Sequence, residues 1–245
     1  MMTPAKERRV PKLLRSQKTS RRRRGPQLTE RDMEILRWIA RHGVVTTELV
    51  GLRFFWRPRS KQVGKWAAYR RLKALDKLGL ILRDKPFAHR PEAIRVSTTG
   101  ARLADVGVQP APLVVSQLDH AYAVIALSEY LLADNDGAAL TTERELRAQR
   151  FRDQRAGEQK SGGRTPDALL EFPKAKGKSK IQTIAVELDL SRKDRRQMQD
   201  MIRAYDREKV DQVWWYVKPE RVERTREVVR DLRADDRIEV REWRG

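Results

Sequence analysis

The sequence predicts a two-domain protein of mixed α and β structure, α+β in its N-terminal half and α/β in its C-terminal half. The chain has 245 residues, which is enough for two modest hydrophobic cores. Helical and strand periodicities alternate along it from Leu28 onward. A proline-containing stretch at 110–112 divides this series in two. We therefore expect a linker over residues 109–117, between domains at 28–108 and 118–245.

The net charge of the chain favours a polyanionic partner. It carries 54 Lys and Arg against 34 Asp and Glu, a formal net charge of +20. Nucleic acid is the expected partner, because neutralised phosphates release condensed counterions. No apolar run approaches the roughly 20 residues that span a membrane, so no membrane partner is expected. The lack of cysteine excludes disulfides and cysteine-based zinc sites, and together with the lack of an apolar leader it favours the cytoplasm.

Residues 1–27 form a basic segment that we expect to be disordered in the free protein. It contains the run Arg21, Arg22, Arg23 and Arg24, and Glu7 is its one acidic residue. Such a segment cannot bury enough apolar surface to fold. It is either a solubilising tail or an arm that follows phosphates or enters a minor groove, and the domain after it favours the arm.

The segment 28–108 has the element order of a winged helix-turn-helix domain. Thr29 and Asp32 resemble a capping box that begins a helix ending at His42 and Gly43. A short helix at 48–52 and a longer one at 62–78 follow. Strands at 80–83 and 93–98 then form a hairpin before a helix at 101–106. The segment 71–81, with its Leu-Gly-Leu-Ile corner, resembles a winged-helix recognition helix entering its wing, which implies binding of double-stranded DNA.

The basic side chains of this segment are the candidate DNA contacts. On the helix they are expected to reach bases or phosphates in the major groove, and on the hairpin they would form the wing. The alternatives are an ordinary solvated helix face and a charged exposed hairpin. Trp56 and Trp66 are expected to pack in the core rather than stack on bases. The candidates are Lys61, Lys65, Arg70, Arg71 and Lys73 on the helix, and Arg83, Lys85 and Arg90 on the hairpin.

The C-terminal half has the order α-β-β-β-α-β, which is that of the PD-(D/E)xK nuclease core. We expect a helix at 118–132, a strand or strand–helix edge at 139–146, a polar loop at 152–163 and a strand at 165–172. After a loop at 174–180 come a strand at 181–190, a helix at 194–208 and a buried strand at 213–217. A helix at 220–232 and a strand at 238–243 complete the chain.

Three acidic residues lie where that nuclease core carries its motif. Asp167 opens the second strand, and Glu187 and Asp189 end the third on one face. Phosphodiester hydrolysis needs a divalent cation to polarise phosphate and activate water, and carboxylates suit Mg²⁺ or Mn²⁺. Asp167 and Glu187 are therefore the candidate metal ligands. Asp189 replaces the usual lysine, and Lys193 is the candidate substitute among the catalytic residues, unless the site is an inactive remnant.

Each of three further residues near these acids has two possible interpretations. Glu143 and Glu145 are either extra metal ligands or members of a salt-bridged surface with Arg144 and Arg147. His120 either touches a phosphate near the acids or is a capping or core histidine, which we favour.

The layout resembles the replication-relaxation family of plasmids and integrative elements, which joins a winged helix to a nuclease-like domain. The segments 165–170, Thr-Pro-Asp-Ala-Leu-Leu, and 186–191, Val-Glu-Leu-Asp-Leu-Ser, carry the resemblance. It implies that Asp189 is a family trait and that the protein serves the replication, transfer or control of a mobile element. It also implies a nucleoid-associated protein of the bacterial cytoplasm, with replication or conjugation proteins as partners.

Two functions follow as hypotheses. The protein is a DNA-binding protein whose C-terminal domain is a metal-dependent endonuclease. Alternatively, it is a non-catalytic transcriptional regulator whose degenerate nuclease domain mediates homodimerisation or partner binding.

Overall fold

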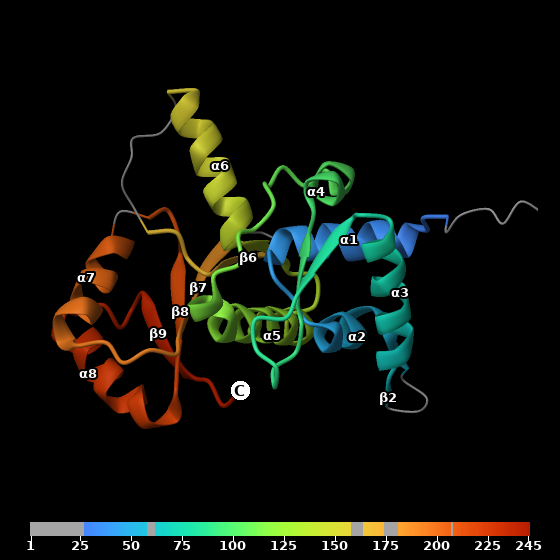
Figure 1. Ribbon diagram of the computed structural model, residues 1–245. Helices are drawn as coiled ribbons and strands as arrows, with labels where there is room; N and C mark the ends of the chain where they lie inside the picture. The colour runs from blue at the N-terminus through green and yellow to red at the C-terminus, as the bar shows by residue number, and fades with distance from the viewer. Residues whose placement is uncertain (1–26, 58–61, 158–163, 174–180, 207) are drawn as a thin grey trace, which may run out of the picture.

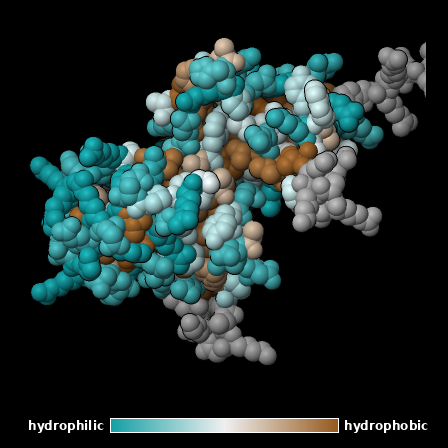
Figure 2. Space-filling model, turned by 90° about the horizontal axis from the view of Figure 1, so that it is seen from below, coloured by the Kyte–Doolittle hydropathy of each residue, from teal (hydrophilic) through white to brown (hydrophobic). Residues whose placement is uncertain are grey.

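The computed structural model describes residues 27–57, 62–157, 164–173, 181–206 and 208–245 (Figure 1). The basic segment with Arg21 to Arg24 and the candidate Lys61 lie outside these residues. In the described part the chain has mixed α and β structure, as the sequence predicts. No helix there is long and apolar enough to cross a membrane. The face seen in Figure 2 is largely hydrophilic, with hydrophobic residues in smaller patches among the polar ones.

The N-terminal half packs helices around two small hairpins. Its elements are α1 (Glu30–His42), α2 (Thr47–Phe55), β1 (Trp56–Arg57), β2 (Gln62–Val63), α3 (Lys65–Lys77), β3 (Ile81–Asp84), β4 (Ala93–Val96) and α4 (Thr98–Ala104). The side chains of Ile35, Leu72 and Leu75 are completely buried in its core. Apolar residues three and four apart on each helix produce this core, because they share one helix face.

Hydrogen-bonded caps begin three of these helices. Thr29 accepts from Asp32 in the capping box that the sequence predicts for α1, and Thr46 accepts from the N–H of Leu49 in α2. Ser97 caps α4, so this helix begins at Thr98 and ends at Ala104, which corrects the expected 101–106. Helix α3 begins at Lys65 rather than 62, because Gln62 and Val63 pair with Arg57 and Trp56.

The C-terminal half is built on a five-stranded sheet in the order β5-β6-β7-β8-β9. The first two neighbouring pairs are antiparallel and the last two are parallel. Its elements are α5 (Leu118–Asp134), β5 (Ala139–Thr142), α6 (Glu143–Arg155), β6 (Ala168–Phe172), β7 (Gln182–Asp189), α7 (Arg195–Tyr205), β8 (Gln212–Val217), α8 (Val222–Asp231) and β9 (Ile238–Glu242).

Helices cover both faces of this sheet. Leu127 and Leu131 of α5 pack on one face of β5, β6 and β7. Helices α7 and α8 cover the opposite face, where Met198, Val228 and Trp215 of β8 belong to one buried cluster (Figure 1). Trp214, Trp215 and Tyr216 are all buried, which confirms their predicted packing role.

Helix α6 replaces part of a predicted strand and a predicted loop. The strand ends at Thr142, whose side chain and backbone form a capping box with Glu145. The following residues, Glu-Arg-Glu-Leu-Arg-Ala-Gln-Arg, are mostly good helix formers, so the chain continues as a helix to Arg155. Of the two expectations for 139–146, the strand–helix edge is the one observed, whereas the loop expected from 152 was wrong up to Arg155. Helix α6 projects away from the sheet (Figure 1).

Polar contacts join the two halves of the chain along α1. The indole Nε1 of Trp38 donates to Glu129 of α5 at 2.9 Å. Arg41 donates to Glu145 of α6 at 2.8 Å, and Arg144 donates back to the carbonyl of Ala40 at 3.1 Å. Ile125 of α5 belongs to the N-terminal core. The two halves therefore share apolar as well as polar contacts.

Candidate functional site

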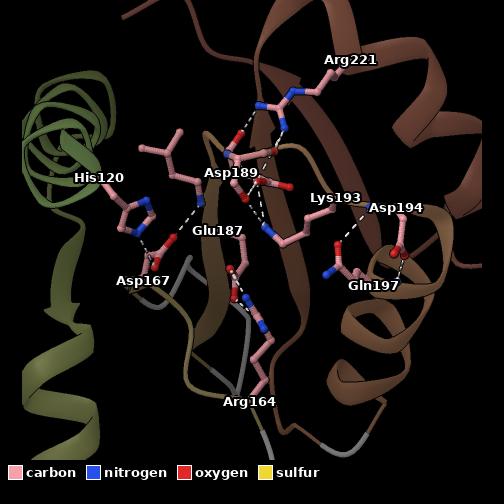
Figure 3. A network of polar contacts seen from close by, with 11 residues as sticks. His120, Arg164, Asp167, Glu187, Asp189, Lys193, Asp194, Gln197 and Arg221 are labelled. Atoms are coloured by element: carbon pink, nitrogen blue, oxygen red, sulfur yellow. Dashed lines mark hydrogen bonds and ion pairs between the residues drawn. The ribbon is translucent and has the colours of Figure 1, made fainter. Parts of the chain in front are cut away.

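The carboxylate of Glu187 is buried near the end of β7 and paired with an arginine (Figure 3). Glu187 is only 3% exposed. The Nε and Nη2 of Arg164 donate to its two carboxylate oxygens at 2.7 and 2.9 Å. The hydroxyl of Tyr205, on α7, also donates to this carboxylate. Both oxygens therefore have strong donors.

Burial and charge act in opposite directions on this group. Burial raises the pKa of Glu187, and the hydrogen bond from Arg164 partly offsets that effect. The same hydrogen bond raises the pKa of Arg164. Burial, followed by the negative charge of Glu187, raises the pKa of Tyr205, so this phenol stays protonated as a donor. The arrangement is a satisfied buried ion pair.

Asp167 lies just before β6 and connects the sheet to α5. Its Oδ2 accepts the backbone N–H of Leu188 at 2.8 Å, and its Oδ1 lies 3.2 Å from Nε2 of His120. The hydrogen bond to Asp167 raises the pKa of His120, against the effect of partial burial. Both residues line a cleft of about 760 Å³ between the two halves. His120 is thus a partner of the acidic site rather than a core or capping residue.

Asp189 ends β7 and has its own set of donors. Its Oδ1 accepts from the N–H and the hydroxyl of Ser191, both at 3.1 Å. The Nζ of Lys193 lies 2.8 Å from the same oxygen, so Lys193 points at Asp189 (Figure 3). Arg221 donates to the backbone carbonyls of Asp189 and Ser191 and thereby holds the end of β7.

The three predicted acids lie in neighbouring positions. Their carboxylate oxygens, however, already accept hydrogen bonds from N–H and O–H groups, and this arrangement does not suit a divalent cation. Arg164 takes both oxygens of Glu187, and Asp167 is shared between a backbone N–H and His120. Within the described residues, no group of three or more His, Cys, Asp or Glu could hold a metal ion. Glu143 and Glu145 form ion pairs with Arg147 and Arg41, the salt-bridged alternative for these two residues.

The exposed face of α3 carries several predicted DNA contacts. Residues 66, 70, 73 and 77 follow a helical repeat and are exposed; we call Trp66, Arg70, Lys73 and Lys77 the α3 stripe. Lys65 is exposed beside it. Trp66 is 77% exposed and Trp56 is 47% exposed, so the expectation that both pack in the core was wrong. Within the described part of the chain, the three cations of the stripe have no carboxylate partner.

Other predicted DNA contacts are engaged within the protein. Arg71 donates through Nε and Nη2 to the buried Asp32 of α1. The Nε of Arg83 donates to Glu92 at 2.9 Å, and its guanidinium lies over Tyr69. Arg90 donates to Asp119 of α5 at 2.7 Å and lies over Phe87. Lys85 is exposed on the hairpin.

Sequence reasoning missed the basic residues that complete the acidic site. Arg164 stands three residues before Asp167, and this proximity of a basic residue to the acidic motif was a usable signal. Arg221 lies 32 residues from Asp189 along the chain and had no such local signal. Tyr205 lies 18 residues from Glu187 and likewise had no local signal.

Comparison with protein-family models, curated proteins and solved structures finds no match to this chain.

Proposed function

We propose that this protein binds double-stranded DNA through α3 and the β3–β4 hairpin, in the manner of a winged helix. The observation that carries the proposal is the α3 stripe, where Arg70, Lys73 and Lys77 are exposed and have no carboxylate partner in the described part of the chain. Unpaired cations on one exposed helix face can contact phosphates and base edges when that helix lies in a major groove.

The packing of α3 supports the same proposal. Leu72 and Leu75 are fully buried, and Arg71 is tied to Asp32, so the helix presents a fixed outer face. The hairpin of Ile81–Asp84 and Ala93–Val96 follows the helix directly, in the position of a wing. Apart from the two-residue strands β1 and β2, the elements follow the predicted order of three helices, a hairpin and a helix, which supports the proposal. Arg71, Arg83 and Arg90 contribute less to this surface, because each has an internal partner.

The C-terminal half supports a non-catalytic role better than a nuclease. Apart from the inserted helix α6, its element order follows the predicted α-β-β-β-α-β series, and this order and the strand directions support a nuclease-like ancestry. The pairing of Glu187 with Arg164, however, leaves neither oxygen for a cation. We therefore favour a domain that mediates dimerisation or contacts a partner. The family resemblance implies a role in the replication, transfer or control of a mobile element.

Equilibrium binding to a labelled duplex tests the first proposal. The double variant Arg70→Ala/Lys73→Ala should bind more weakly, with the slope of log K against log salt reduced by about 2. Arg196→Ala/Arg230→Ala removes the same charge from exposed positions on α7 and α8 and serves as the control. Equal losses in both variants would mean that the α3 stripe has no special part in binding.

Cleavage of supercoiled, linear and single-stranded DNA tests the nuclease alternative. The protein and its Glu187→Ala variant are incubated with Mg²⁺ or Mn²⁺, and binding is followed on the same samples. We expect binding without cleavage. Metal-dependent nicking that disappears in Glu187→Ala would instead establish the nuclease and reject the non-catalytic role.

A further inference from the structure

A basic pocket lies at the edge of the sheet where the parallel strands β7 and β8 end. It has a volume of about 380 Å³, and we call it the basic pocket. Strand β7 ends at Asp189 and β8 ends at Val217, and the helices that follow them, α7 and α8, begin at this same edge. In sheets of this kind the carboxyl ends of parallel strands are the usual place for a ligand.

The charge of the basic pocket is strongly positive. Five basic side chains line it against two acidic ones; they are Arg192, Lys193, Lys218, Arg221 and Arg224, with Asp189 and Glu220. The negative charge of Asp189 is already offset, because its buried carboxylate lies 2.8 Å from the Nζ of Lys193. In the described part of the chain, the side chains of Arg192, Lys218 and Arg224 form no hydrogen bond or ion pair. These three cations therefore stay available to an anion.

Two local features hold the pocket ready for a negatively charged group. Arg221 is fixed by its hydrogen bonds to the carbonyls of Asp189 and Ser191, so its charge is held in place at the rim. Helix α8 has ten residues, begins at Val222 directly after a 3-10 turn at Pro219–Arg221, and has no side-chain cap. The positive end of this helix dipole adds to the field of the side chains.

A second cavity lies next to the basic pocket along α7. It has a volume of about 430 Å³, shares Arg192 and Lys193 with the basic pocket and reaches Arg164. A group bound by its charge in the first cavity thus has room for an attached chain in the second. Neither cavity has room for a DNA duplex, so a ligand enters as a strand end or as a small molecule.

We propose that the basic pocket binds a phosphate monoester, such as the terminal phosphate of a nucleic-acid strand or of a nucleotide. A monoester carries close to two negative charges at neutral pH, which matches several unpaired cations better than the single charge of a phosphodiester does. Lys218, Arg224 and Arg192 hold the phosphate oxygens, and the rest of the ligand runs toward Arg164.

Competition binding with the full chain tests this site separately from the α3 stripe. One probe is a single-stranded oligonucleotide with a 5′-phosphate. Its control has a 5′-hydroxyl and two more nucleotides, so that the two carry the same charge. A nucleoside 5′-monophosphate, with the free nucleoside as its control, forms the second arm. The variants are Lys218→Ala/Arg224→Ala and the charge-matched Arg196→Ala/Arg230→Ala, all at exposed positions.

We expect the phosphorylated probe to bind about tenfold more tightly than its charge-matched control. This preference should disappear in Lys218→Ala/Arg224→Ala and persist in Arg196→Ala/Arg230→Ala. Preference for the oligonucleotide alone identifies a strand end, and tight binding of the monophosphate identifies a small-molecule ligand. No preference in either arm, or an equal loss in both variants, overturns the proposal, and neither result bears on duplex binding by α3.

Discussion

Arg164 and Glu187 form a two-point ion pair across the end of the sheet, with N–O distances of 2.7 and 2.9 Å. The carboxylate is buried, whereas the arginine side chain is 34% exposed. This difference in exposure matters, because a buried carboxylate that has lost its hydration and has no partner destabilises the folded protein. Arg164 therefore stabilises the fold through Glu187.

Replacing Arg164 with methionine should destabilise the protein. The uncompensated Glu187 is expected to cost about 3 kcal/mol, the low end for broken buried pairs, since Arg164 is partly exposed. In the double variant Arg164→Met/Glu187→Gln no buried charge remains, so much of that stability should return. Urea denaturation of the wild type, Arg164→Met and the double variant measures both effects. A double variant no more stable than Arg164→Met would contradict the coupling.

Arg71→Met and Arg70→Ala should separate folding from DNA binding on one helix. Arg71 is paired with Asp32, whose side chain is 1% exposed, and the hydrogen bonds from Arg71 help to lower the pKa of Asp32 despite its burial. Arg71→Met should cost about 3 kcal/mol of unfolding free energy and leave the salt slope of DNA binding nearly unchanged. Arg70→Ala should do the opposite. Denaturation and salt-dependent binding of the two variants provide the comparison, and a reduced salt slope in Arg71→Met would assign that residue to the DNA surface after all.

Local signals account for what the sequence could predict. Capping residues and the period of the leucines define most helices, and runs of β-branched and aromatic residues define β7 and β8. The same signals identify Asp167 and Glu187 as acids near strand ends. These local signals failed at α6, because the sequence around Thr142, which forms a capping box, can also be interpreted as a continuing strand.

The partners of the charged residues depend on the tertiary structure and could not be read from the sequence. Arg70 and Arg71 are adjacent and identical, but the burial of Leu72 and Leu75 turns one outward and the other toward Asp32. Arg164 and Glu187 are 23 residues apart, and only the pairing of β6 with β7 brings their segments together. An acidic residue near a strand end thus predicts where a charged group lies. The residue that pairs with it determines what that group can do, and this partner depends on the tertiary structure.

Two histidines should titrate far apart. Burial, reinforced by the charges of Arg41 and Arg53, lowers the pKa of His42 to about 3, whereas Asp167 raises the pKa of His120. In an NMR titration His42 should therefore stay neutral through mildly acidic pH, while His120 gains its proton above the ordinary histidine pKa. Titration of His42 in the ordinary range would show that it is solvated.

The two histidines also have opposite effects on stability. The pKa of His120 is raised by folding, so its contribution is full below the unfolded pKa and is lost as pH rises through the folded value. His42 favours folding least in acid, because the unfolded chain takes up a proton that the folded protein does not. The variant His120→Gln should thus lose more stability at about pH 5.5 than at about pH 8. Denaturation at the two pH values measures this, and an equal loss at both would contradict the charged contact with Asp167.

Gly100→Ala should destabilise the corner between α4 and β3. A Cβ at Gly100 would lie 1.9 Å from the carbonyl oxygen of Leu80, which already accepts the N–H of Ser97 at 3.0 Å. Backbone on both sides must then move, and we expect a loss of about 2 kcal/mol even though alanine favours a helix. Thr99→Ala, at the exposed neighbouring position of α4, is the matched control and should change stability by less than about 0.5 kcal/mol. Thermal or urea denaturation of both variants provides the measurement, and a Gly100→Ala protein as stable as Thr99→Ala would mean that α4 does not pack this closely against Leu80.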